Sequence, residues 1–280
     1  MMFSIYGNDK FIRKYVDIGY HTGLGDDRYK VGPYKLMLDG SSMGGTCALR
    51  TPYSHDPERK GILTMDQATL NEMVLKGHRD NYQITCHCIG DLAVEMILNA
   101  YENALTILPK EDHRFRIEHC AITDRELIGR IKALGVIPIP QPEFMYSSGD
   151  TYYKLYGDRV HMMFPLKSFL DAGIPCAFST DCPVVEEDAM LVLRSAVKRE
   201  SSTGRDVGKK QEISIMDAIR MYTMNGAYAA FEENQKGSLE KGKLADMIIL
   251  SKPILDAAVD DLCSIEVEKT FIGGKVVYSK

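Results

Sequence analysis

Short apolar runs alternate with amphipathic stretches along most of the chain. The apolar runs predict five strands, at residues 33–38, 82–88, 114–119, 136–140 and 174–179. The amphipathic stretches predict helices, at residues 8–19, 66–79, 91–107, 123–134, 165–172, 188–199 and 214–230. Strands and helices that alternate at this spacing are typical of parallel βα units in an α/β fold.

The two longest connections and the last part of the chain depart from this pattern. Residues 39–63 and 141–162 form long connections, and connections of more than about 12–15 residues often carry function. The last residues carry short alternating runs, and Gly273-Gly274 between two of them predicts a tight hairpin. We therefore predict a domain of parallel βα units, part of a barrel, over residues 1–232 and a small β appendage over residues 233–280.

Composition and charge narrow the class of protein. Hydrophobic residues make up 45% of the chain and charged residues 26%, which is typical of a globular protein rather than a disordered one. The net charge is −5 and no dense Lys/Arg block occurs, so a nucleic-acid partner is not expected. No apolar run reaches the ~18 residues of a membrane helix, so a membrane partner is not expected either. The N-terminus has no signal-peptide pattern and the seven cysteines have no framework spacing, which predicts a cytoplasmic, reduced protein.

Four polar side chains recur on the predicted strands, close to their carboxyl ends. His87 and His119 end two strands, Asp181 follows a third, and Lys35 lies in the first. Each taken alone has an ordinary explanation, as a hydrogen-bonded histidine, a turn residue or a surface lysine. In a βα barrel the carboxyl ends of the strands converge on the active site. Two imidazoles and a carboxylate are the ligands of a catalytic zinc site, so four such positions favour a shared metal site.

Four cysteines adjoin these positions and offer an alternative as thiolate ligands or nucleophiles, namely Cys86, Cys88, Cys120 and Cys182. Neighbouring residues of a strand point to opposite faces of the sheet. If His87 points to one face, Cys86 and Cys88 point to the other, toward the helices. We therefore expect these two cysteines to be buried core residues.

Several short strings occur in a specific order along the chain. They are Y-K-L-M-L-D-G-S (34–41), H-C-I-G-D (87–91), R-I-E-H (116–119), Q-P-E-F (141–144), S-T-D-C-P (179–183) and G-S-L-E-K-G-K-L-A-D-M-I-I-L (237–250). In this order the chain resembles the amidohydrolase superfamily, and most closely its YtcJ-like branch. The resemblance covers nearly all of residues 30–280.

The resemblance implies a fold, a reaction and roles for particular residues. The fold would be the C-terminal portion of a TIM (β/α)8 barrel, with about five βα units, plus a small β-sandwich appendage. The reaction would be hydrolysis of amide or imide C–N bonds in a small-molecule substrate, through a water activated by one or two divalent metal ions, with zinc expected. Lys35 would be a carboxylated bridging ligand, His87 and His119 further ligands, and Asp181 both a ligand and the general base. Substrate contacts would come from the long connections, at Asp39, Tyr53 and Gln141.

One element of the family pattern is absent from this sequence. The family carries a His-x-His pair on its first barrel strand, and no two of the seven histidines have that spacing. We therefore expect the N-terminal part of the barrel to be missing, so that the chain acts within a longer or split hydrolase. The alternative is a catalytically incomplete remnant or metal-binding module; the ordered strings disfavour an unrelated α/β protein. Because a closed barrel needs eight strands, we expect the strand of Lys35 and the strand before Asp181 to have open edges. Such edges predict a homo-oligomer or pairing with an N-terminal half.

Overall fold

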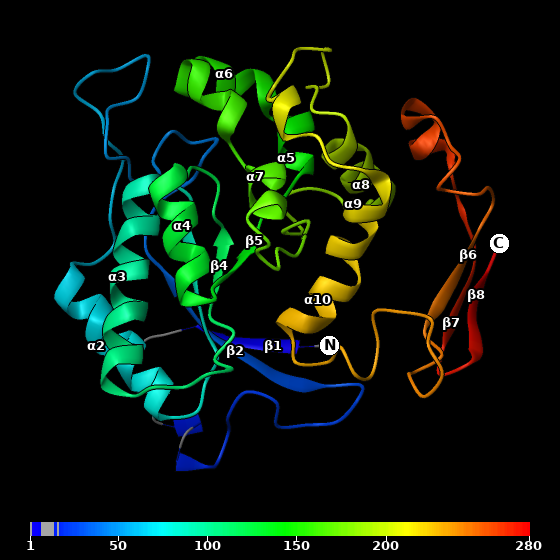
Figure 1. Ribbon diagram of the computed structural model, residues 1–280, viewed down its shortest axis with the longest axis horizontal. Coiled ribbons are helices and arrows are strands. Elements are labelled where there is room, and N and C mark those ends of the chain that lie inside the picture. Colours follow the sequence, from blue (N-terminus) through cyan, green and yellow to red (C-terminus); the bar gives the residue numbers. More distant parts are fainter. Residues whose placement is uncertain (1, 7–13, 16) are drawn as a thin grey trace.

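A parallel sheet of five strands forms the centre of the computed structural model, which describes residues 2–6, 14–15 and 17–280 (Figure 1). The strands are β1 (Met2–Tyr6), β2 (Lys30–Met37), β3 (Ile84–Cys88), β4 (Arg116–His119) and β5 (Ile137–Ile139). They lie side by side in sequence order, and every neighbouring pair is parallel. This confirms the predicted α/β fold with a parallel sheet.

Helices follow the strands and flank the sheet (Figure 1). They are α2 (Gln67–Arg79), α3 (Asp91–Ile107), α4 (Arg125–Leu134), α5 (Glu143–Ser147), α6 (Gly149–Tyr156), α7 (Leu166–Asp171), α8 (Ala189–Val197), α9 (Ile215–Tyr222) and α10 (Met224–Ala229). Local capping sets several ends: the Asp66 carboxylate accepts from the N–H of Thr69 at 2.8 Å and begins α2. Gly135, with a φ of +66°, ends α4 in the left-handed conformation that glycine adopts without strain.

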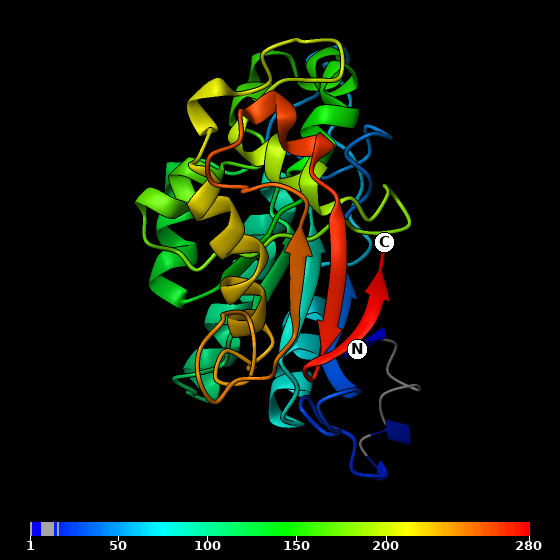
Figure 2. The same ribbon diagram turned by 90° about the vertical axis from the view of Figure 1, so that its right-hand side faces the viewer.

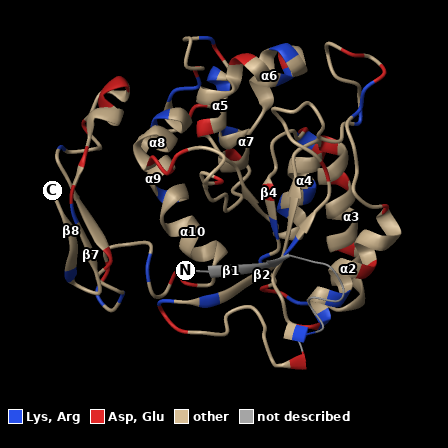
Figure 3. Cartoon of the chain, turned by 180° about the vertical axis from the view of Figure 1, so that it is seen from behind, with Lys and Arg blue, Asp and Glu red and all other residues tan. Residues whose placement is uncertain are grey.

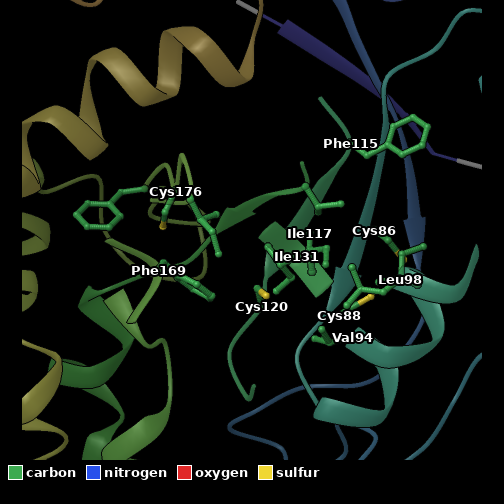
Figure 4. Close-up of a cluster of buried hydrophobic side chains, with 14 of the residues drawn as sticks. Cys86, Cys88, Val94, Leu98, Phe115, Ile117, Cys120, Ile131, Phe169 and Cys176 are labelled. Carbon is green, nitrogen blue, oxygen red and sulfur yellow. The ribbon is translucent and has the colours of Figure 1, made fainter. Parts of the chain in front are cut away.

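The face of the sheet that packs on the helices is apolar. Cys86 and Cys88 of β3 are fully buried in one cluster with Val94 and Leu98 of α3 (Figure 4). The prediction that these cysteines belong to the core on the helix side is confirmed. Alternate residues of the same strand, among them His87, therefore face the opposite side of the sheet.

The segment predicted as a fifth βα strand, residues 174–179, is not a regular strand. It does lie beside β5, because two of its N–H groups donate to the carbonyls of Pro138 and Pro140 at 3.1 and 3.2 Å. The reciprocal bonds of a parallel ladder would need the N–H groups of residues 140 and 142, and both residues are prolines. Because these prolines have no N–H, all the ladder hydrogen bonds that the described residues form between this segment and β5 are donated by the segment and none by β5.

The sheet reaches five strands because β1, which the sequence pattern did not predict, joins it at the edge next to β2. Strand β1 pairs with β2 in parallel, with Tyr6 opposite Lys35, so the prediction that the strand of Lys35 is an open edge is wrong. The helix predicted at 8–19 falls largely outside the described residues. The helix predicted at 214–230 is confirmed but divided, because Thr223 has φ −118° and ψ −80° between α9 and α10.

A second, antiparallel sheet follows α10 and lies on the outer side of α8 and α9 (Figure 1), and Figure 2 shows this sheet facing the viewer. Its strands are β6 (Met247–Leu250), β7 (Val267–Ile272) and β8 (Lys275–Ser279). Gly273 and Gly274, with φ of +56° and +76°, form the turn between β7 and β8, which confirms the predicted hairpin.

Basic and acidic positions are interspersed along the chain, as Figure 3 shows. Among the helices of the described residues, none combines the length and the apolar character needed to cross a membrane.

Candidate metal centre

Two of the predicted ligands meet at the carboxyl ends of adjacent strands. The ring centroids of His87 in β3 and His119 in β4 are 4.5 Å apart, with the planes at 75°. The exposed fractions are 9% for His87 and 4% for His119, so both imidazoles are shielded from water. The fold thus brings together two residues that are far apart in the sequence.

A break in strand geometry makes this meeting possible. The register pairs His87 with Glu118 and Cys88 with His119, and paired residues of parallel strands point to the same face. A regular strand would therefore turn His119 toward the helices, with Cys88. His119 has a left-handed φ of +71°, which ends the alternation and lets its ring reach His87. Such strained conformations in residues other than glycine often mark functional positions.

Each imidazole has one nitrogen engaged by an oxygen of the protein. The Nε2 of His87 lies 2.9 Å from the carbonyl oxygen of Gly40, with Asp39 Oδ1 at 3.4 Å. Because a carbonyl only accepts, His87 carries its proton on Nε2 and keeps the lone pair on Nδ1. The Nδ1 of His119 lies 2.7 Å from Oε1 of Gln141, which leaves Nε2 of His119 on the other side of the ring.

The electrostatic surroundings keep both rings neutral near pH 7. Burial lowers the pKa of His87 to about 4, helped by the neighbouring His119 and by Lys35. Burial also lowers the pKa of His119 to about 4, against the opposing effect of its hydrogen bond to Gln141. A neutral imidazole is the form that binds metal.

Lys35 and Asp181 belong to the same electrostatic environment. Lys35 is half-buried and pairs in register with Thr85, so it shares the face of the sheet that carries His87. Asp181 has a left-handed φ of +62°. Burial raises the pKa of Asp181, while Lys35 and His87 act to lower it without cancelling the rise. Lys35 and Asp181 thus interact electrostatically with His87, and the roles of all four predicted residues as ligands stay a prediction.

Asp39 is a buried anchor for the backbone around the site. The residue is 3% exposed, and its carboxylate accepts three backbone hydrogen bonds, from the N–H groups of Ala48 at 3.0 Å, Ile89 at 3.0 Å and Gly90 at 2.8 Å. Gly90 is the N-cap of α3, and the carboxylate binds the N–H groups of Ile89 and Gly90 just before the helix, where a negative charge interacts favourably with the helix dipole. A substrate contact of Asp39 stays a prediction that would have to compete with these bonds.

The other two predicted substrate contacts are also buried. Tyr53 is 2% exposed, and its hydroxyl donates to the carbonyl of Cys47 at 2.8 Å. Gln141 is 1% exposed and is hydrogen-bonded to His119 and to backbone. Their contact with a substrate stays a prediction, whereas their contacts with the protein are part of the structure.

Sequence reasoning missed the other polar side chains on this face. Glu118 accepts a hydrogen bond from the hydroxyl of Thr85 at 2.6 Å and forms an ion pair with Arg116. Burial alone would raise the pKa of Glu118, but Arg116 and Thr85 outweigh it and lower the pKa. Counting alternate residues back from His87 would have found Thr85, whereas placing Glu118 beside His87 requires the register of the two strands.

The polar side chains around His87 and His119 offer few donors for a metal ion. Within the described residues, no three His, Cys, Asp or Glu side chains come together closely enough to hold an ion. His87 and His119 nevertheless fit a divalent metal, since both are neutral and adjacent, and each has one ring nitrogen that no oxygen of the described residues engages. Cys86 and Cys88 face the helices and are not available to this site (Figure 4).

Comparison with known proteins decides the family. The model of the Amidohydrolase family matches residues 8–278. The chain belongs to the amidohydrolase family. The chain is 32% identical over 253 residues to the protein YtcJ of Bacillus subtilis strain 168, covering 89% of this chain and 47% of that protein. The resemblance to the YtcJ-like branch is therefore confirmed.

Other similar proteins extend this result. The amidohydrolase-family chain is 26% identical to N-substituted formamide deformylase of Arthrobacter pascens, covering 76% of this chain and 40% of that enzyme. It matches the crystal structure of an uncharacterized metal-dependent hydrolase from Pyrococcus horikoshii OT3 with a TM-score of 0.75 and 28% identity, over 84% of this chain and 47% of the other. The chain spans about half the length of the curated relatives it matches.

Proposed function

We propose that this chain forms part of a metal-dependent hydrolase that cleaves amide or imide C–N bonds in a small molecule. The observation that carries the proposal is the pair of neutral imidazoles, His87 and His119, in contact at adjacent strand ends. Two relatives support the reaction class, since one is named a deformylase of N-substituted formamides and another a metal-dependent hydrolase.

The proposed fold is the C-terminal portion of a (β/α)8 barrel, with a β-sandwich part after residue 232. Sequential strand order supports it, because right-handed crossovers between neighbours place every helix on one face, as in a barrel. A doubly wound sheet would instead reverse its strand order. The antiparallel strands β6 to β8 would form the appended unit over residues 233–280.

In this proposal His87 would hold a divalent metal, zinc as the first choice, through Nδ1, and His119 through Nε2. The metal would supply Lewis-acid activation of a water molecule. Asp181 would accept the proton from that water and deliver it to the leaving nitrogen. Lys35 would contribute a ligand after reaction with CO₂. Burial shields the two imidazoles, which strengthens electrostatic interactions within the site.

Zinc binding by the full 280-residue chain tests the proposal. Isothermal titration calorimetry is expected to show binding that His87→Ala and His119→Ala each weaken. His78→Ala is the matched control, because His78 is equally buried and bonds the carbonyl of Leu108 at 2.8 Å, outside the site. Equal zinc binding by all three variants and the parent chain would overturn the metal site.

A second candidate is a metal-binding module without hydrolytic activity. It is favoured by the lack of a third close His, Cys, Asp or Glu ligand within the described residues. A panel of N-formyl amines, cyclic imides and simple amides separates the two candidates. Zinc-dependent release of product supports the hydrolase, whereas zinc binding with no turnover of any panel member supports the module.

A further inference from the structure

We propose that Gln141 is a positioning residue that fixes His119 in the tautomer protonated on Nδ1. This leaves the lone pair of His119 on Nε2, the ring nitrogen that does not contact Gln141. The tautomer follows from hydrogen bonding alone; only its use for metal binding rests on the proposed function.

The amide of Gln141 is held by three polar groups in a buried setting. Its Oε1 lies 2.7 Å from Nδ1 of His119, and its Nε2 donates to the carbonyl of Ile139 at 2.7 Å and to the hydroxyl of Ser179 at 2.8 Å. The side chain is 1% exposed. Both amide hydrogens are thus engaged, and a substrate could use them only by displacing one of these partners.

The identity of these partners determines the proton position. The carbonyl of Ile139 can only accept a hydrogen bond, so the NH₂ end of the amide must face it. The oxygen end then faces His119 and can only accept, so Nδ1 of His119 must be the donor. The hydroxyl of Ser179 can donate or accept and therefore does not decide the orientation.

The same amide joins three parts of the site. His119 ends β4, Ile139 ends β5, and Ser179 stands two residues before Asp181. The one-sided hydrogen bonding of residues 174–179 makes this side-chain bond an additional attachment between that segment and β5. Outer hydrogen-bond partners of metal-binding histidines commonly set ring orientation and tautomer, and their loss typically weakens metal affinity 10–100-fold.

The tautomer is measurable in the metal-free chain. Long-range ¹H–¹⁵N NMR spectra of the uniformly labelled protein distinguish protonated from unprotonated ring nitrogens, and His119→Ala assigns the signals. Protonated Nδ1 and unprotonated Nε2 are expected for His119. A ring protonated on Nε2 in the parent chain would overturn the inference without any need for a variant at position 141.

Variants then test the cause. Gln141→Leu is expected to lose the fixed tautomer, whereas Ser179→Ala is expected to keep it, because the carbonyl of Ile139 still orients the amide. Gln211→Leu is the matched control, since Gln211 is also buried and bonds Ser168, away from His119. An unchanged His119 tautomer in Gln141→Leu, with thermal unfolding still cooperative, would contradict the assignment.

Metal affinity gives a second readout. Zinc titration is expected to show a loss of roughly 10–100-fold for Gln141→Leu and no comparable loss for Gln211→Leu. If the two variants bind zinc equally, the positioning role is overturned even though a metal site exists. If the parent chain binds no zinc but shows the expected tautomer, the proposed function fails while the role of Gln141 in fixing the ring stands.

Discussion

Replacing Asp39 by asparagine should reveal how strongly its carboxylate holds the backbone around the site. The Asp39 side chain is fully buried, and its carboxylate accepts three backbone hydrogen bonds. Oδ2 accepts hydrogen bonds from the N–H groups of Ala48 and Gly90, and Oδ1 accepts one from the N–H of Ile89. An asparagine amide has only one oxygen, so at least one of these donors would face an NH₂ group instead.

The expected cost follows from these contacts. Losing a hydrogen bond to a charged group costs about 1.5–3 kcal/mol. Losing the negative charge at the N-terminus of α3 would add about 0.3–1 kcal/mol, but burial disfavours the charged form and raises the pKa of Asp39 to about 6, which offsets this addition. We therefore expect Asp39→Asn to lower the free energy of unfolding by about 2–3 kcal/mol. With an m-value of ~3 kcal/mol/M, the urea midpoint would fall by about 1 M.

Urea unfolding followed by circular dichroism measures this loss. Asp66→Asn is the matched control, because Asp66 is exposed, accepts one backbone N–H at 2.8 Å, and asparagine caps a helix about as well. The control should change stability by less than ~0.5 kcal/mol. If Asp39→Asn differs from the control by no more than that, the carboxylate is not the anchor inferred from its contacts. A raised KM with unchanged stability would instead support the predicted substrate contact.

Four further outcomes are expected. Asp181→Asn should reduce any hydrolysis by ~10²–10⁴ with an unchanged circular dichroism spectrum, and activity near that of the parent would exclude Asp181 as the general base. Bicarbonate should strengthen zinc binding through a carbamate on Lys35, and an equal bicarbonate response in Lys35→Ala would contradict this. Gly90→Ala should destabilise the fold strongly, because the added Cβ would lie 1.8 Å from the carbonyl oxygen of Ala48. The control Gly129→Ala, with open space around its Cβ, should stabilise the helix by about 1 kcal/mol. Similar changes in stability for the two variants would refute the close approach at Gly90. Light scattering on the isolated chain should show self-association, which a monodisperse monomer would refute.

The sequence by itself determined the features that depend on residues close together in the chain. The alternation of apolar runs and amphipathic stretches predicted β2 to β5 and the helices α2, α3 and α4. Period-two geometry placed Cys86 and Cys88 in the core, and Gly273-Gly274 predicted the last turn. These succeed because strand period and turn chemistry act over only a few residues.

Only the tertiary structure decided how the candidate site is arranged. His119 reaches His87 because a left-handed φ ends the strand alternation, which residue spacing does not reveal. The proton positions of both rings depend on partners elsewhere, Gly40 for His87 and Gln141 for His119. The pairing of β1 with β2 likewise joins segments separated in sequence. Such contacts form only when distant segments pack together, so local sequence patterns cannot predict which oxygen accepts a hydrogen bond from which nitrogen.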